Sequence, residues 1–287
     1  MLKEEITKII LSLYREMGGN VIDHDTAGNG STRGYVIFDP PVIGFGSAHD
    51  RLFDEYKKPG IIGPWHMSPD EWLPDAETVI SVFFPFSEEV RESNRLGEQP
   101  SFEWLCGRIE GQAYIAGFSD ELKVSLERLG ISVCVPCVDS RFKSVKRGTG
   151  IDGYADMTPD TYGSRWSERH AAYVCGLGTF GLSKGLITAK GIAGRFTSLI
   201  IFERIVPDKR SYSGIYDYCL MCGACVRRCP AGAITLEKGK DHAICEKWLI
   251  NTAERYAPRY GCGKCQAGVP CEAGIPLKEY ADPALLH

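Results

Sequence analysis

The C-terminal part of the sequence contains a run of cysteines with the spacing of an iron–sulfur protein. Cys219, Cys222, Cys225 and Cys229 follow the pattern C-x2-C-x2-C-x3-C, and Pro230 comes directly after the last of them. At this spacing the first three thiolates bind one [4Fe–4S] cluster, and the fourth, beside proline, binds the other cluster of a two-cluster ferredoxin. A zinc site, the alternative, favours two separated pairs of ligands. The run therefore predicts [4Fe–4S] binding.

The remaining ligands of two clusters must come from further along the chain. The downstream cysteines are Cys245, Cys262, Cys265 and Cys271. The simplest partition assigns one cluster to Cys219, Cys222, Cys225 and Cys271, and the other to Cys229, Cys245, Cys262 and Cys265. Two such clusters would form a one-electron relay of low potential, which requires a reducing compartment. We therefore expect a ferredoxin-like domain over residues 211–287, in the cytoplasm of an anaerobic cell.

A glycine-rich stretch precedes the cysteines. Residues 162–188 read YGSRWSERHAAYVCGLGTFGLSKGLIT, so a charged, aromatic helix runs into Gly176, Gly178 and Gly181. Glycines allow the backbone to turn sharply and to approach a ligand closely. They would either line a flat cofactor or form a helix stop and an ordinary loop. Cys175, inside the turn, would either approach that cofactor or fill space as a small buried hydrophobe.

The elements that position these residues read as a mixed α/β (α+β) domain over residues 1–210. The periodicity predicts an opening helix from Leu2 to Met17, and a second helix with Ser119 as its N-cap and Gly130 as its stop. Apolar, β-branched runs predict strands over 78–86, 131–138 and 197–203. A boundary is expected within 207–214. The sequence contains no GxGxxG fingerprint or P-loop, so a nucleotide site has no direct support.

Composition and charge exclude several classes of protein. The formal net charge is −4, which makes a nucleic-acid partner unlikely because phosphate binding depends on clustered Lys and Arg. No apolar run reaches about 18 residues, the length that spans a membrane. The N-terminus MLKEEITKIILSLYREMGG carries acidic residues and does not resemble a signal peptide. These observations predict a cytoplasmic protein with no membrane partner.

Several of these motifs together resemble one known family. S-E-R-H-A-A-Y-V-C-G-L-G-T-F-G, a glycine-initiated strand, C-x2-C-x2-C-x3-C-P and Y-G-C-G-K-C-Q are similar to the epoxyqueuosine reductases and the related reductive dehalogenases. The resemblance runs from about Leu73 to Cys271. It implies a cobalamin held base-off in a domain of nitroreductase-like fold, facing a ferredoxin-like domain with two [4Fe–4S] clusters. It further implies that the clusters reduce the cobalt to Co(I) and that a nearby side chain protonates the substrate.

The resemblance also suggests cofactor contacts and a proton donor. The cofactor contacts would be Cys175, Gly176, Gly178, Gly181, Ser183, Lys184, Arg195, Thr197 and Ser198. Counting back thirteen residues from Cys175 leads to Tyr162. Tyrosine is the donor in the dehalogenases, and its unperturbed pKa of about 10 suits donation to a strongly basic anion. Asp139, in a V-D-S that resembles the reductases' own, is the alternative donor, although it lies far from the G-L-G. Tyr162 would otherwise be structural.

Two departures from the family pattern affect the expected function. The last cysteines read C-G-K-C-Q-A-G-V-P-C-E, with two extra residues before Cys271 and no proline after it. The chain stops at His287, without the helical-repeat domain that helps tRNA-acting reductases hold tRNA. We therefore expect a reductase of a small molecule, supplied by an external low-potential electron donor. The alternatives are an electron-transfer protein that activates a separate corrinoid protein, and a flavin in place of cobalamin.

Overall fold

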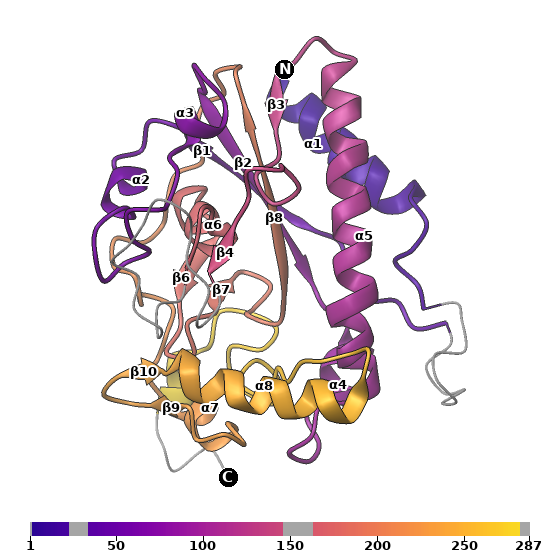
Figure 1. The fold of residues 1–287 in the computed structure, drawn as a ribbon, viewed down its shortest axis with the longest axis vertical. Helices are drawn as coiled ribbons and strands as arrows, with labels where there is room; N and C mark the ends of the chain where they lie inside the picture. The colour runs from indigo at the N-terminus through magenta and orange to yellow at the C-terminus, as the bar shows by residue number, and fades with distance from the viewer. Residues whose placement is uncertain (1, 23–33, 146–162, 282–287) are drawn as a thin grey trace.

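The structure is a computed structural model of the 287-residue chain, and it describes residues 2–22, 34–145 and 163–281 (Figure 1). The elements are α1 (Leu2–Glu16), β1 (Val42–Ser47), α2 (Leu52–Glu55), α3 (Pro69–Trp72), β2 (Thr78–Pro85), α4 (Glu88–Ser93), α5 (Phe102–Glu127), β3 (Val133–Cys134), β4 (Ser144–Val145), β5 (Gly163–Ser164), α6 (Glu168–Val174), β6 (Gly178–Phe180), β7 (Leu186–Thr188), β8 (Gly194–Ile201), α7 (Ala224–Arg227), β9 (Ile234–Thr235), β10 (Gly239–Lys240), α8 (His242–Tyr256) and the 3-10 helix η1 (Lys278–Ala281).

The front of the chain is built on an antiparallel sheet of four strands in the order β1-β2-β8-β3. Every residue of β2 is buried, because strands flank both of its edges and helices cover both of its faces. β3 pairs only with Ile200 and Ile201 of β8. Among the described strands, none pairs with the rest of that edge of β8, from Gly194 to Leu199. Such an edge leaves backbone donors and acceptors open to another partner.

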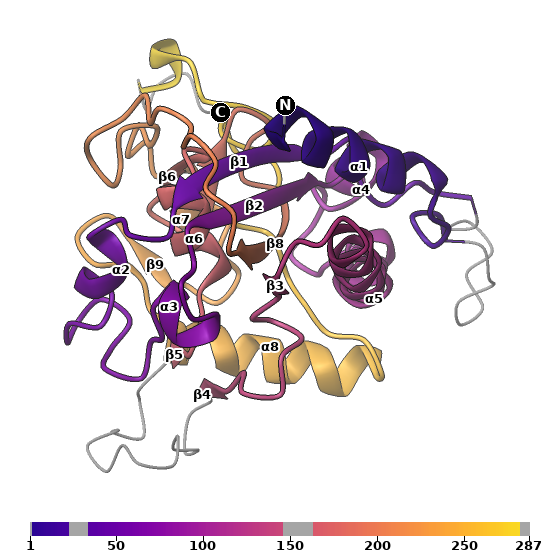
Figure 2. The ribbon, with the colours of Figure 1, turned by 90° about the horizontal axis from the view of Figure 1, so that it is seen from above.

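Helices form a layer on each face of this sheet. Figure 2 shows α5 and α1 on one side of the sheet, with α6, α2 and α3 on the other. Ile6 and Ile10 of α1 are fully buried, four residues apart on one helix face. In α5, a Cβ on Gly107 would lie 2.7 Å from the Phe86 ring, so this glycine allows helix and sheet to pack closely. The helices therefore bury the apolar faces that the periodicity predicts.

The second predicted helix is longer than expected, and its predicted start was wrong. α5 begins at Phe102, where the Ser101 side chain accepts a hydrogen bond from the Trp104 amide. Ser119 lies in the middle of α5, where its hydroxyl donates to the Ile115 carbonyl and forms a 2.8 Å hydrogen bond with the Thr197 hydroxyl. The serine thus joins the helix to β8 and does not cap it. The predicted stop is correct, since Gly130 follows the helix with a φ of 81°.

The other predicted elements agree with the structure, except for one strand. The opening helix corresponds to α1, and the runs at 78–86 and 197–203 correspond to β2 and β8. The run at 131–138 forms only the two-residue strand β3. Pro136 follows closely, and a proline has no amide hydrogen to donate to the neighbouring strand.

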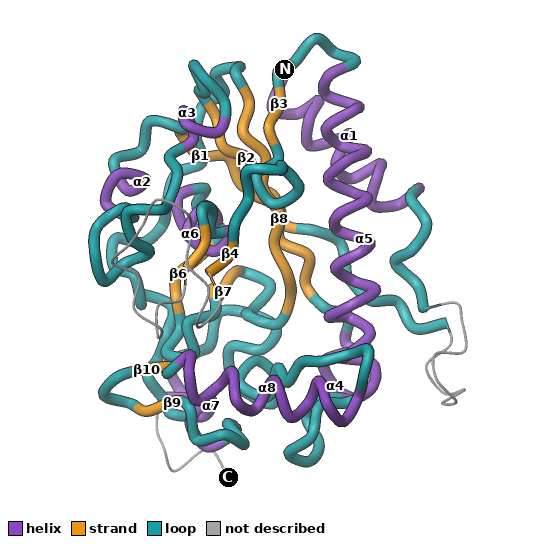
Figure 3. The backbone as a smooth tube through the Cα atoms, in the orientation of Figure 1, coloured by secondary structure: helices purple, strands orange, loops and turns teal. Residues whose placement is uncertain are grey.

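The cysteine-rich segment lies at one end of the sheet, with α8 across the bottom of Figure 1. Figure 3 shows that most of this segment is loop, apart from α8 and short helices and strands. No described helix has both the length and the apolar character needed to cross a membrane. The cysteine-rich segment packs closely against the preceding residues. The domain boundary expected within 207–214 stays a prediction.

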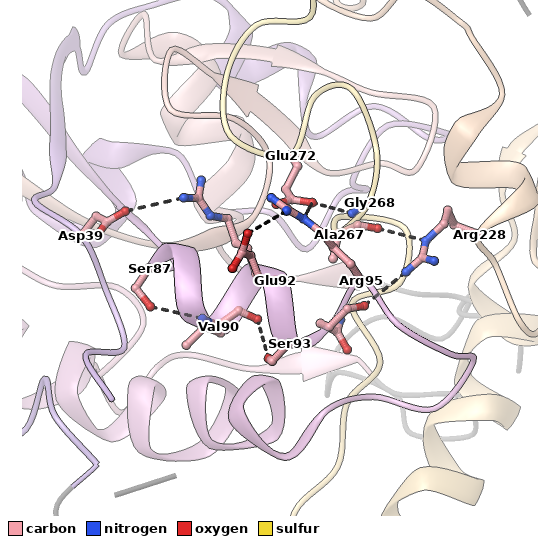
Figure 4. A network of polar contacts seen from close by, with 12 residues as sticks. Asp39, Ser87, Val90, Glu92, Ser93, Arg95, Arg228, Ala267, Gly268 and Glu272 are labelled. Carbon is pink, nitrogen blue, oxygen red and sulfur yellow. Dashed lines mark hydrogen bonds and ion pairs between the residues drawn. The ribbon is translucent and has the colours of Figure 1, made fainter. Parts of the chain in front are cut away.

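Charged side chains join the cysteine-rich segment to α4 and the loop that follows it (Figure 4). Arg95 donates from Nη2 and Nε to the carboxylate of Glu272, at 2.7 Å and 3.1 Å from Oε1, and Glu272 is only 5% exposed. Arg228 donates to the Ala267 carbonyl, and Lys264, 1% exposed, donates to the Asn94 carbonyl at 2.9 Å. These contacts hold the loop that carries Cys271.

Candidate active site and metal centres

One cavity is lined by the first three cysteines of the run and by Cys271. Cys219, Cys222, Cys225 and Cys271 share a cavity of about 30 Å³ whose other walls are mainly apolar. Gly223, with a φ of 72°, makes the turn that starts α7 between these cysteines. The Cys271 carbonyl accepts from the Ile192 amide at 2.9 Å, which fixes the last cysteine beside the others.

A second cavity is lined by the other four cysteines of the expected set. Cys229, Cys245, Cys262 and Cys265 share a cavity of about 220 Å³. Its walls also include Trp104 and Arg108 of α5 and Arg195 of β8, so it reaches the front of the chain. Burial, and next the negative charges of Cys265 and Cys219, raise the pKa of Cys225 to about 12, which indicates that the two sets are close neighbours.

The spacing within each set decides what kind of metal could bind. A zinc ion holds its four ligands at about 2.0–2.3 Å. No group of three His, Cys, Asp or Glu residues in the described part of the chain is close enough to hold one ion. In the described part of the chain neither set therefore has the geometry of a mononuclear metal site. The eight cysteines group as the sequence partition predicts, while their occupancy by two clusters stays a prediction.

The glycine turn after α6 is occupied by protein. Cys175 is fully buried, its thiol donates to the Val79 carbonyl, and burial raises its pKa. A Cβ on Gly178 would lie 1.9 Å from the Ile187 carbonyl oxygen, and one on Gly181 would contact the Ile187 side chain. Gly176, with a φ of 80°, turns the chain out of the helix. These contacts favour the alternative reading for Cys175 and for the glycines, a core cysteine and a closely packed turn.

The remaining predicted cofactor residues lie in two separate places. Ser183 lines the first cysteine cavity, and Lys184, with a φ of 59°, is the next residue along that turn. Arg195, Thr197 and Ser198 lie on β8, along the edge that β3 leaves unpaired. Of these residues the structure places only Arg195 in the wall of the second cavity, and cofactor binding by any of them stays a prediction.

The two candidate proton donors differ in what can be said of them. Tyr162 lies outside the described residues. Asp139 forms a two-pronged ion pair with Arg141, at 2.7 Å and 2.9 Å, and this guanidinium is the main cause that holds the aspartate pKa well below its usual range. Arg141 in turn donates to the Trp72 carbonyl. A carboxyl held in its ionised form is a poor proton donor, so this geometry disfavours Asp139.

Glu168, at the start of α6, was missed by the sequence interpretation. Both of its carboxylate oxygens are buried, and the Ser198 hydroxyl is the neighbouring group that can donate a hydrogen bond to this carboxylate. Burial raises its pKa to about 7, while Ser198 of β8 acts in the opposite direction. Its charge also contributes to raising the pKa of Cys137, after the larger effect of burial. The only sequence signal was its place in the S-E-R-H motif, because burial of a glutamate cannot be read from residue type.

We expect Cys271→Ser to remove one cluster and leave the other. Serine is a weaker ligand than thiolate, so iron content should fall from about eight to about four atoms per chain. Iron and sulfide analysis after anaerobic purification measures this. Cys137→Ser, at a cysteine outside both cavities, is the control and should keep all of the iron. Unchanged iron in Cys271→Ser would contradict the assignment of Cys271 as a ligand.

We expect Glu168→Gln to stabilise the cofactor-free protein above about pH 5. The folded-state pKa is about 7 against an ordinary value of 4.5, so the unfolded chain ionises first as the pH rises. The wild-type free energy of unfolding should therefore fall between these two values, by up to about 3 kcal/mol. Chemical denaturation from about pH 5 to about pH 8, which spans the folded-state pKa, measures the difference. Glu121→Gln, at an exposed site on α5, should leave the slope unchanged; an equal slope in Glu168→Gln would refute the effect.

Comparison with known proteins gives one family model and several solved structures. The model of the 4Fe-4S binding domain matches residues 213–235, a segment that contains Cys219 to Cys229. No curated protein matches the sequence. The fold is similar to that of an epoxyqueuosine reductase from Bacillus subtilis, at 17% identity and a TM-score of 0.50, over 100% of this chain and 67% of the reductase.

The same fold occurs in reductive dehalogenases. The catabolic reductive dehalogenase NpRdhA aligns at 15% identity and a TM-score of 0.50, over 85% of this chain and 32% of the dehalogenase. Another reductive dehalogenase, whose structure suggests a mechanism for B12-dependent dehalogenation, aligns over 96% of this chain and 38% of its own, at 14% identity and a TM-score of 0.50. This chain thus spans about a third of these dehalogenases. The resemblance inferred from the motifs is confirmed in the fold, which this chain shares with epoxyqueuosine reductases and reductive dehalogenases.

Proposed function

We propose that this chain is a cobalamin-dependent reductase that passes electrons through two [4Fe–4S] clusters to cobalt and on to a small-molecule substrate. One observation carries the proposal: the cavity of the second cysteine set is also walled by Trp104, Arg108 and Arg195 of the front domain. A cluster in that cavity would lie directly beside the domain that has to receive its electrons. The similarity in fold to reductases of this kind supports the same reading.

The order of the two cysteine sets suggests a direction for electron flow. Met221, between Cys219 and Cys222, is 41% exposed, so the first set lies close to the surface. An external low-potential donor would deliver electrons there. The proximity of Cys225 to Cys265 supports transfer from the first set to the second. The second set then passes the electrons to the front domain.

The edge of β8 offers a place for a corrinoid. The edge of β8 from Gly194 to Leu199 leaves backbone groups without a strand partner, and the buried carboxylate of Glu168 lies beside it, next to Ser198. Buried polar groups without partners are costly, so they indicate a polar ligand. Cobalamin carries peripheral amides that suit such groups, and when bound it would supply a redox-active cobalt. Glu168 would accept hydrogen bonds from those amides, and the β8 backbone would orient the ring.

Cofactor uptake tests this proposal. Anaerobically purified protein should contain about eight iron atoms per chain, and added cobalamin should bind in the base-off form. Metal analysis and the absorption spectrum of the bound corrinoid measure both. Eight irons without corrinoid uptake would refute the reductase and leave an electron-transfer protein. Bleaching near 450 nm on reduction (roughly where flavins absorb) would instead indicate a flavin.

We propose Tyr162 as the proton donor, since the ion pair with Arg141 holds Asp139 ionised. Tyr162→Phe should leave cobalamin uptake intact and lower kcat by about 10²–10⁴-fold, the usual contribution of a general acid. Asp139→Asn is the matched comparison and should retain most of the turnover. Loss of cofactor binding together with turnover in Tyr162→Phe would contradict a role confined to proton donation.

A further inference from the structure

The indole N–H of Trp248 is a buried hydrogen-bond donor in the wall of the second cavity. Trp248 lies on α8 and lines this cavity together with Cys245 and Leu249 of the same helix. Residues three and four apart share one helix face, so α8 presents the Cys245 thiol and the Trp248 ring to the same space. Within the described part of the chain, no atom accepts a hydrogen bond from Trp248 Nε1. The protein therefore leaves this donor unused.

The contacts of α8 fix Trp248 relative to the cysteines of the second set. The Thr252 hydroxyl donates to the Leu249 carbonyl at 2.8 Å and accepts from the Gly261 amide at 3.3 Å. Thr252 is only 2% exposed, and Gly261 directly precedes Cys262. The helix is thus tied to the loop that carries Cys262, next to the ring of Trp248 in the cavity wall.

The protein groups around the cavity do not serve as the acceptor. The four thiols of the second set line the same cavity as Trp248, but none of them accepts from its Nε1. The wall also includes Phe86, Ile234 and Leu249, whose side chains have no acceptor atoms. A buried N–H without an acceptor is costly, so it indicates a ligand with an acceptor. A [4Fe–4S] cluster on these cysteines would supply inorganic sulfide, which is such an acceptor.

We propose that the Trp248 indole N–H donates a hydrogen bond to a sulfide of the second cluster and raises the reduction potential of that cluster. The inference rests on the proposed function only in requiring a cluster on the second set. Hydrogen bonds to sulfur help to set cluster potentials, because a donor stabilises the reduced form, which is more negative. On reduction the cluster gains one electron and Trp248 keeps its proton.

This bond would favour electron transfer toward the front domain. Trp248 lines the second cavity and not the first, so it would raise the potential of one cluster only. The second cavity is the one whose wall includes Arg195 of β8. An electron would therefore be stabilised on the cluster that borders the front domain. Trp248 is a residue that tunes this step, and it does not contact the substrate.

Redox titration of the cluster-loaded protein without corrinoid, followed by EPR, tests this role. In Trp248→Phe, which removes the N–H and keeps an aromatic ring, reduction of one cluster should become about tenfold less favourable, a shift of about 59 mV to lower potential. The other cluster should keep its wild-type potential. Trp72→Phe is the matched control. The Trp72 N–H is also buried without an acceptor in the described residues, but it lies on α3, outside both cavities, so both potentials should stay unchanged.

Pulsed EPR of the reduced protein with an isotope-labelled indole nitrogen measures the bond itself. A coupling between this nitrogen and a reduced cluster should appear in the wild type and in Trp72→Phe, and it should vanish in Trp248→Phe. Iron content shows whether each variant is fully loaded. If Trp248→Phe loses the second cluster, Trp104→Phe assigns the wild-type coupling, because Trp104 is the other indole in the cavity wall. A coupling that persists in Trp104→Phe supports Trp248, and one that is lost there refutes it.

Several outcomes would overturn the proposal. Wild-type protein without indole coupling would do so, and so would unchanged potentials in fully loaded Trp248→Phe. An equal shift of both potentials, or a similar shift in Trp72→Phe, would show that the change reflects altered packing and not the hydrogen bond. Because the titration uses no corrinoid, failed cobalamin uptake would contradict the proposed function separately.

Discussion

The ion pair between Arg95 and the buried carboxylate of Glu272 holds the cysteine-rich segment against the rest of the molecule. Glu272 is 5% exposed and follows Cys271 directly, so the position of that cysteine depends on the partner of its neighbour. The Arg95 side chain is 42% exposed, so solvent weakens the attraction, and the pair matters mainly because it satisfies the buried Glu272 carboxylate. Lys264, between two other cysteines and bonded to the Asn94 and Leu96 carbonyls, provides a second attachment. The two cysteine sets are thus held against α4 and the loop after it.

This attachment explains how a mostly irregular segment can present eight thiols in two groups. Loops seldom hold side chains accurately by themselves, and a scaffold must position them. Here the segment is held in place by contacts with α4, with the start of α5 and with the turn before β8. At that turn the Ile192 amide donates a hydrogen bond to the Cys271 carbonyl. A Cβ on Gly191 would lie 2.1 Å from the Glu272 carbonyl oxygen, so that approach requires a glycine. The positions of the cysteine thiols and the packing of the segment against the sheet domain therefore depend on the same contacts.

Electrostatics divides the second cavity into two regions. Lys240 lies near the thiols, and the Arg108–Arg195 pair lies where α5 meets β8. Glu168, next to Ser198 of β8, is a buried carboxylate whose pKa burial raises to about 7. Buried charges of this kind are costly in an empty protein and useful in one that binds a polar ligand. That cost is the physical reason for proposing that the cofactor binds at the edge of β8.

The sequence alone determined the chemistry of the cysteines, because metal-binding spacing is local: three ligands within seven residues reach one cluster whatever surrounds them. It also predicted α1, β2 and β8, whose apolar periodicity is read directly from the chain. It could not show that Ser119 lies inside a helix or that the glycines after Cys175 pack against Ile187, since both depend on contacts with distant segments. Only the tertiary structure brought Arg108, 87 residues away in the chain, to Arg195 and left Glu168 buried. Burial and charge are properties of the packed molecule, and residue types do not encode them one by one.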